Sequence, residues 1–125
     1  MTMIEKDLTR VEAVVLKAIL PYSRQELITR THLVAVVNRM GFRIEERAVR
    51  DVIKNLRRKG YLICALPGVE GGYYIAQSRK EYEEFRQKEY IAKISDMSKT
   101  VRAMDTATIT QFGDAQQLEL NLDIL

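Results

Sequence analysis

The stretch VRDVIKNLRRKGYLI (Val49–Ile63), which runs on into GGYYIA (Gly71–Ala76), decides the fold. Apolar residues recur in its first part at spacings of three and four, which predicts a helix that ends at Gly60. Beyond that glycine, Tyr61–Leu66 and Tyr73–Ala76 have the composition of strands. A loop of about five or six residues, rich in glycine and with one proline, separates them, so we expect an antiparallel hairpin.

The helix before the hairpin, expected from about Glu45 to Lys59, has two opposed faces when drawn at about 100° per residue. The apolar face comprises Ala48, Val49, Val52, Ile53 and Leu56. The charged face comprises Arg47, Arg50, Asp51, Lys54 and Arg58, with Arg57 on its flank. The sequence therefore predicts a helix that is buried on one side and basic on the other.

A first helix is expected near the start of the chain. Thr9 and Glu12 have the spacing of a capping box, and Pro21 ends the helix that follows. The connector beyond the proline is expected to hold a short strand around Leu27 and Ile28.

A second helix is expected between this connector and the basic helix. Thr29 or Thr31 is the predicted cap at its start, and Gly41 is the predicted stop. Its apolar positions are Leu33, Val34, Val37 and Met40.

A long charged helix is expected after the hairpin, from a capping box at Ser78 and Glu81 to about residue 105. Its apolar residues recur at alternating spacings of four and three, as in a coiled-coil seam: Tyr90, Ile94, Met97, Val101 and Met104. The seam predicts either a homodimer or packing of the helix on its own domain through Tyr82 and Phe85. Residues 106–125, with three acids and no Lys or Arg, are expected to form an acidic, flexible tail.

The order of helix, helix, turn, helix and hairpin, with Val49–Ile63 running into Gly71–Ala76, resembles the winged helix-turn-helix family, above all its small bacterial and bacteriophage members. The resemblance covers about residues 8–78. It implies an α+β fold of three helices and a two-stranded hairpin, the wing, and here a long C-terminal helix and tail follow. The expected domains are a winged helix-turn-helix over 1–78, a helix over 79–105 and the tail over 106–125.

In that family the third helix enters the major groove of duplex DNA and the wing touches the backbone beside it. Arg can bind guanine O6 and N7 together, and the N-terminal half of such a helix meets bases. The expected DNA contacts are Arg47 and Arg50 at base edges, Lys54, Arg57 and Arg58 at phosphates, and Arg43, in the turn, at either. The alternative is a solvated face on which Glu46 and Arg50 pair with each other.

The wing departs from the basic wing that the family often carries, because Glu70 is the only charge between Leu66 and Gly72. The backbone N–H groups of Gly71 and Gly72 either meet a phosphate or only allow the turn. The charge is distributed unevenly along the chain. Residues 1–80 hold 15 Lys and Arg against 8 Asp and Glu, whereas residues 81–125 hold 5 Lys and Arg against 9 Asp and Glu. The basic part suits a polyanion.

Composition argues against several classes of protein. Cys64 is the only cysteine and His32 the only histidine, so neither an internal disulfide nor a four-ligand zinc site is expected, and Cys64 is predicted to be a buried strand residue. No apolar run approaches the roughly 20 residues of a membrane span, and the start lacks a signal-peptide core, so a cytoplasmic protein without membrane contact is expected. No catalytic triad and no phosphate-cradling Gly-rich loop occur, which predicts neither enzyme activity nor a cofactor.

The extreme C-terminus resembles the short peptide by which bacterial proteins bind the replication sliding clamp. Gln117, Leu118, Leu120 and Leu122 match its six-residue form, Glu119 approximates an acidic position, and Asn121 replaces a proline. The alternative is a C-terminal strand or a segment buried on the domain.

Three functions follow from these observations. The first is a sequence-specific duplex-DNA-binding regulator of transcription or replication, of bacteriophage or similar origin by resemblance. The second is an adaptor that links DNA to a replication partner such as the clamp through Gln117–Leu122. The third is a winged helix used only for protein contact.

Overall fold

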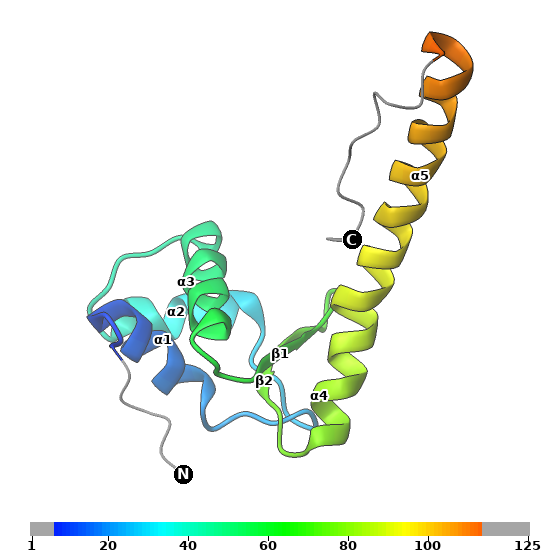
Figure 1. The fold of residues 1–125 in the computed structure, drawn as a ribbon. Helices are drawn as coiled ribbons and strands as arrows, with labels where there is room; N and C mark the ends of the chain where they lie inside the picture. Colours follow the sequence, from blue (N-terminus) through cyan, green and yellow to red (C-terminus); the bar gives the residue numbers. More distant parts are fainter. Residues whose placement is uncertain (1–6, 114–125) are drawn as a thin grey trace. The chain divides into compact units, whose positions relative to one another are not determined.

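The computed structural model describes residues 7–113 and shows an α+β chain of helices and one two-stranded antiparallel sheet (Figure 1). The elements in order are α1 (Arg10–Ile19), α2 (Arg30–Arg39), α3 (Glu46–Arg58), β1 (Ile63–Leu66), β2 (Gly72–Ile75), α4 (Arg79–Phe85), the π-helical segment η1 (Arg86–Ile91) and α5 (Ala92–Phe112). The chain divides into two compact units, Met1–Glu83 and Glu84–Leu125. In the described part, no helix combines the length and apolar character that crossing a membrane requires.

The first two helices begin at the predicted caps. Thr9 Oγ1 accepts from the Glu12 amide at 3.1 Å, and Glu12 Oε1 accepts from the Thr9 amide at 3.0 Å, which completes the capping box of α1. At α2 the cap is Thr29, whose Oγ1 accepts from the His32 amide at 3.1 Å. Thr31 lies inside the helix, so only one of the two threonines named as caps has that role.

The cap of α4 differs slightly from the predicted capping box. Ser78 Oγ accepts from the Glu81 amide at 3.2 Å, as expected. The Glu81 carboxylate reaches one residue further back and accepts from the Gln77 amide at 2.9 Å.

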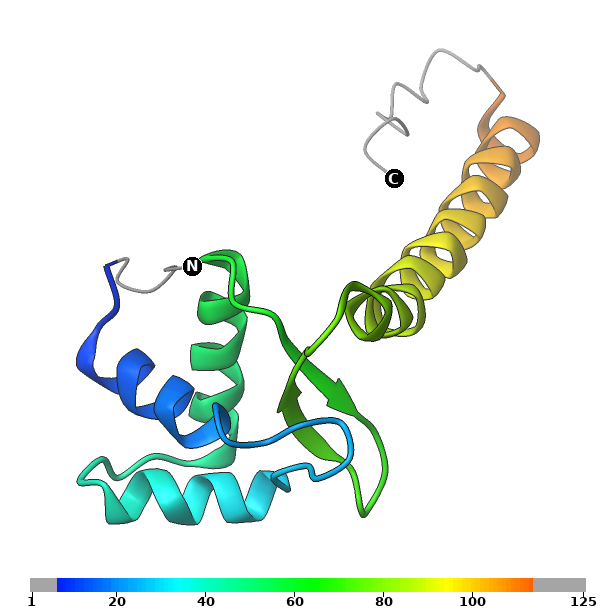
Figure 2. The same ribbon diagram turned by 90° about the horizontal axis from the view of Figure 1, so that it is seen from below.

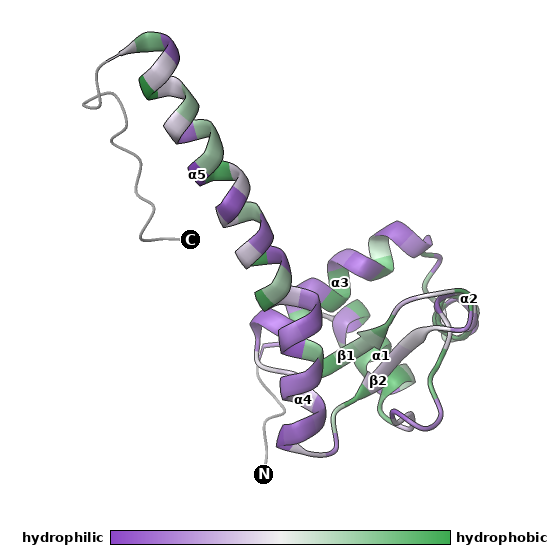
Figure 3. Ribbon diagram, turned by 90° about the vertical axis from the view of Figure 1, so that its right-hand side faces the viewer, coloured by the Kyte–Doolittle hydropathy of each residue, from purple (hydrophilic) through white to green (hydrophobic). Residues whose placement is uncertain are grey.

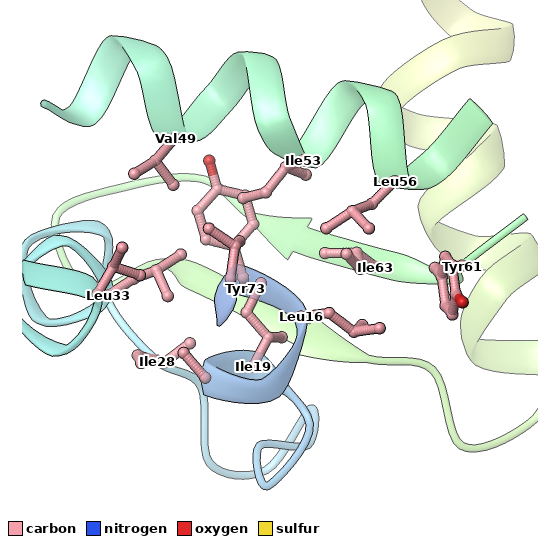
Figure 4. Close-up of a cluster of buried hydrophobic side chains, with 13 residues drawn as sticks. Leu16, Ile19, Ile28, Leu33, Val49, Ile53, Leu56, Tyr61, Ile63 and Tyr73 are labelled. Atoms are coloured by element: carbon pink, nitrogen blue, oxygen red, sulfur yellow. The ribbon is translucent and has the colours of Figure 1, made fainter. Parts of the chain in front are cut away.

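The core of the first unit forms where the apolar faces of the three helices meet the sheet. Figure 4 shows Val49, Ile53 and Leu56 pointing from α3 toward side chains of the sheet and of α1. Helix α1 packs against both α2 and α3, and Figure 2 shows α3 running beside the hairpin. The other buried members of this cluster are Val15, Leu16, Ala18, Ile19, Ile28, Leu33, Val37, Tyr61, Ile63 and Tyr73.

The hairpin has the predicted antiparallel pairing, with Ile63 opposite Ile75 and Leu66 opposite Gly72. The connector between α1 and α2 adds one bridge to it. The Ile28 amide donates to the Tyr73 carbonyl at 3.0 Å, and the Tyr73 amide donates to the Ile28 carbonyl at 2.9 Å. The strand expected around Leu27 and Ile28 is therefore a single bridged residue.

This bridge explains why glycine precedes Tyr73. Gly72 is buried, and a Cβ there would overlap the carbonyl of Ile28. A Cβ on Gly71 would overlap the carbonyl oxygens of Leu66 and Pro67. The two glycines let backbone segments approach each other more closely than a side chain would allow.

Three details of the first unit differ from expectation. Strand β1 begins at Ile63 because Tyr61 instead closes the end of α3, where its amide donates to the Leu56 carbonyl at 3.1 Å. Ala48 is exposed, since it lies at the edge of the apolar arc of α3. Met40 follows the last residue of α2 and is 40% exposed.

The second unit contains a helix longer than the sequence pattern predicts. Helix α5 continues to Phe112, so residues 106–112, expected in the tail, are helical. The hydroxyl of Thr106 donates to the Arg102 carbonyl at 3.0 Å, and that of Thr108 donates to the Asp105 carbonyl at 2.6 Å. No Gly or Pro lies between Ala92 and Gly113, so the polar composition of residues 106–112 does not end the helix.

Candidate nucleic-acid interface

Helix α3 exposes a charged face opposite the face that it buries. Val49, Ile53 and Leu56 are at most 2% exposed, and Val52 is half-buried. The predicted charged positions, Arg47, Arg50, Asp51, Lys54 and Arg58, are all exposed. Figure 3 accordingly colours most of α3 hydrophilic. The predicted separation of the two faces is confirmed for every residue except Ala48, which is exposed.

Three cations on this face and one before it have no partner among residues 7–113. No side-chain hydrogen bond or ion pair engages Arg47, Lys54 or Arg58 there, and the same is true of Arg43 in the preceding turn. On an ideal helix the three helical positions lie within about 40° of one another around the axis. They form a stripe of positive charge that the fold does not use internally.

Arg50 behaves as the alternative interpretation anticipates. Its guanidinium lies 3.3 Å from the Glu46 carboxylate, one turn earlier on α3. Both side chains are well exposed, at 63% and 45%, and such pairs contribute only about 0.3–0.5 kcal/mol. The pair therefore costs little to open if a stronger acceptor approaches.

Arg57 differs from the other predicted contacts because it is half-buried and supports the fold. Its Nε donates to the Ile63 carbonyl at 2.7 Å, which ties the last turn of α3 to the first residue of β1. Arg57 thus connects α3 to β1, whereas its contact with a phosphate stays a prediction.

The turn between α2 and α3 is fixed by a side chain of α2. Asn38 Oδ1 accepts from the Ile44 amide at 2.9 Å, and Gly41 has a φ of 104° where the helix ends. A hollow of about 480 Å³, lined by Asn38, Arg43, Ile44 and Glu45, opens at this turn. Arg43 is thereby held just ahead of the charged face of α3.

The loop of the hairpin, residues 67–71, carries no cation. The Gly71 amide donates to the Gly68 carbonyl at 3.0 Å, so it is engaged within the loop and Gly71 serves the turn. Val69 is 99% exposed and Glu70 is also exposed. The loop therefore offers an apolar and an acidic side chain where a phosphate-binding wing would offer Lys or Arg.

Sequence reasoning missed an ion pair that engages another cation of α3's C-terminal end, Lys59. Lys59 Nζ lies 2.7 Å from Glu12 Oε1 and also donates to the Asp7 carbonyl at 2.7 Å. The Lys59 ammonium and the Thr9 amide both lower the pKa of Glu12 by hydrogen bonding to its carboxylate. No local sequence pattern indicates this pair, because the two residues are 47 positions apart in the chain.

Two arginines outside α3 lie over aromatic rings. The guanidinium carbon of Arg10 is 6.0 Å from the centre of the Phe42 ring, and that of Arg30 is 5.7 Å from the centre of the Tyr73 ring. Both distances fall within the range of a cation–π contact. These contacts give the two arginines a role within the fold.

Cys64 is a buried strand residue, as predicted, and it lies opposite Tyr74 in the hairpin. Burial raises the pKa of the Cys64 thiol and raises the pKa of Tyr74 to about 12. Both groups stay neutral near neutral pH. Among residues 7–113 no three His, Cys, Asp or Glu side chains are grouped so as to hold a metal ion.

Comparisons of this chain with models of protein families, with curated proteins and with solved structures found no match. The clamp-binding prediction, on Gln117, Leu118, Leu120 and Leu122, lies outside the described residues.

Proposed function

We propose that the first unit is a winged helix-turn-helix domain that binds duplex DNA through the exposed face of α3. The observation that supports this most is the opposition of the two faces of α3. One face has three apolar side chains that are at most 2% exposed, and the other has Arg47, Lys54 and Arg58, which have no partner among residues 7–113. A major groove about 12 Å wide admits one α-helix, and exposed Arg and Lys neutralise phosphates.

The cations have different roles in this proposal. Arg47, in the first turn of α3, contacts a base edge, and Arg50 joins it by exchanging Glu46 for a base. Lys54 and Arg58, further along the same face, contact phosphates, and Arg43 contacts whichever strand passes the turn. Arg57 is left out of the principal contacts because its Nε is bonded to Ile63.

The proposed wing is a minor contributor to DNA affinity. Its loop carries Glu70 and no Lys or Arg, so it adds repulsion rather than attraction near a phosphate. The proposed specific contacts therefore come from α3 and its preceding turn.

A homodimer through α5 is part of the proposal. Met97 and Met104 are 62% and 64% exposed and belong to the coiled-coil seam, together with Tyr90, Ile94 and the half-buried Val101. A two-fold dimer would present two copies of α3 to two half-sites and so roughly double the DNA contact area.

Regulation of transcription or replication is the process to which we assign this DNA binding. The adaptor hypothesis, in which Gln117–Leu122 binds a clamp, stays a prediction. Protein contact through α3 is the remaining alternative, and the next experiment decides between it and DNA binding.

The test is duplex binding across a salt series for the parent chain and for Arg47→Ala/Arg50→Ala/Lys54→Ala. We expect the logarithm of the parent's binding constant to fall steeply with the logarithm of the salt concentration, since each neutralised phosphate contributes a slope of about −0.9. The triple variant should bind more weakly and lose about 1 from that slope, because Lys54 is the one residue of the three that is assigned to a phosphate.

A matched variant controls for net charge. Lys17→Ala/Lys80→Ala/Lys99→Ala removes three exposed cations from other helices, and it should retain most of the parent's affinity. Equal binding by the parent and both variants would mean that α3 is not the DNA-binding helix, and protein contact would then be the better assignment.

A further inference from the structure

Asp51 is an acid in the middle of the basic face of α3. It is exposed, follows Arg47 by four residues and precedes Lys54 by three, so both cations are its neighbours on the helix surface. Even so, no hydrogen bond or ion pair engages its carboxylate among residues 7–113. The other acid of this helix that has a cation one turn away, Glu46, does pair with it.

The fold gives no reason for an acid at this position. Asp51 lies within the helix, away from the cap at Glu45, and its side chain is exposed. Asp is also a poor helix former in a helix interior. On a surface that binds DNA it lowers general affinity, because it repels the phosphates that the neighbouring cations attract.

A carboxylate in the major groove distinguishes bases because it can only accept hydrogen bonds. Guanine presents the acceptors O6 and N7 there, and thymine presents O4, so both repel it. Cytosine presents only its N4 amino group, a donor, whereas adenine sets an acceptor beside its donor. An ionised Asp is thus best matched to cytosine.

We propose that Asp51 determines base specificity by accepting a hydrogen bond from the N4 amino group of a cytosine. The inference rests on the proposed binding of duplex DNA by α3. Four residues of helix rise about 6 Å, so the cytosine lies within about two base pairs of the base that Arg47 contacts. The acid weakens binding to all DNA and strengthens discrimination at one position.

The experiment selects duplexes from a randomised pool with the full parent chain, with Asp51→Ala and with Asp51→Asn. The selected sites are then measured with each of the four bases at every position. For the parent we expect one position at which replacing cytosine weakens binding by about 5- to 150-fold. Asp51→Ala should bind all four bases at that position within about threefold, and it should bind unrelated duplexes more tightly than the parent does.

Asp51→Asn tests the chemistry of the contact with an almost isosteric side chain. Asn carries both a donor and an acceptor and pairs with adenine N6 and N7, so the preference at this position should move from cytosine to adenine. Glu26→Gln, which removes an exposed acid outside α3, is the control for charge and should leave the preference unchanged.

Failure of this inference differs from failure of DNA binding. A parent that selects a sequence while Asp51→Ala keeps the same preference at every position overturns the role of Asp51 and leaves DNA binding intact. A parent that binds DNA without any base preference also overturns it. A parent that binds no duplex overturns both proposals.

Discussion

At the scale of single residues, the contact between Glu12 and Lys59 joins the start of α1 to the end of α3. The carboxylate is 5% exposed and accepts from both the Lys59 ammonium and the Thr9 amide. One side chain thus caps a helix and neutralises a cation that would otherwise extend the basic surface. Its hydrogen bonds favour the ionised form, which is why its pKa is lowered.

We expect Glu12→Gln to reduce the free energy of unfolding by about 1–3 kcal/mol near neutral pH, because the amide keeps the cap but loses the charge. The pKa of Glu12 is lower in the folded than in the unfolded chain. Its carboxylate therefore stabilises the fold at pH values above 4.5, the ordinary pKa of the group. That contribution is lost as the pH falls through the folded pKa.

Chemical denaturation of parent and variant at several pH values measures this. The stability difference should shrink as the solution is acidified from about pH 5 to pH 3. Glu26→Gln serves as the control, since Glu26 is exposed, and its effect should be small. A difference between Glu12→Gln and the parent that does not change with pH would contradict the assigned ion pair.

At the scale of elements, the connector between α1 and α2 is joined to the hairpin by the bridge between Ile28 and Tyr73 and by the Ile75 amide, which donates to the Tyr22 carbonyl at 3.3 Å. The bridge depends on Gly72, where backbone meets backbone. It brings the connector and the sheet together beneath α3, and Figure 4 shows Ile28 and Tyr73 within the same buried cluster. A glycine thus permits the backbone contact that brings Ile28 and Tyr73 together in the core.

We expect Gly72→Ala to destabilise the protein by about 1–3 kcal/mol, because the new methyl group overlaps a backbone carbonyl that cannot turn away as a side chain would. Thermal unfolding followed by circular dichroism measures the effect. Val69→Ala, on the exposed loop of the same hairpin, should leave the melting temperature nearly unchanged. Equal melting temperatures for both variants would show that the close approach at Gly72 is unimportant.

At the scale of the whole molecule, the two units carry different kinds of surface. The first offers the basic face of α3. The second offers a helix whose alternating polar and apolar residues are visible along α5 in Figure 3, with Ile109 and Phe112 extending its exposed apolar set. Apolar residues at coiled-coil spacing are favourable in water only when a partner helix covers them.

We expect the parent to be a dimer and Met97→Asp/Val101→Asp to be a monomer, because charges in the seam would be desolvated between the helices. Light scattering coupled to size-exclusion chromatography measures the mass. Ser95→Asp/Thr106→Asp adds the same charge outside the seam and should remain dimeric. A monomeric mass for the parent would contradict the proposed dimer. It would leave the proposed binding of DNA by a single α3 unaffected.

The sequence by itself determined the three helices and the hairpin of the first unit and the faces of α3. Caps and stops depend on a few neighbouring residues, so Thr9, Gly41 and Gly60 could be identified from local spacing, and the cap of α2 could be limited to Thr29 or Thr31. The buried face of α3 followed from helical periodicity, which also placed Arg47, Lys54 and Arg58 on the exposed side. Local physical chemistry was sufficient for each of these.

Only the tertiary structure decided which cations remain available on the surface. Arg57 is bonded to Ile63, Lys59 is paired with Glu12, and Arg30 lies over Tyr73; each partner is on another element. Asp51, by contrast, has no hydrogen-bond or ion-pair partner among the described residues. Helical periodicity predicts which face of a helix is exposed to solvent. It does not predict the partner of a long side chain, because that partner comes from an element that is distant in the sequence and is brought near only by folding.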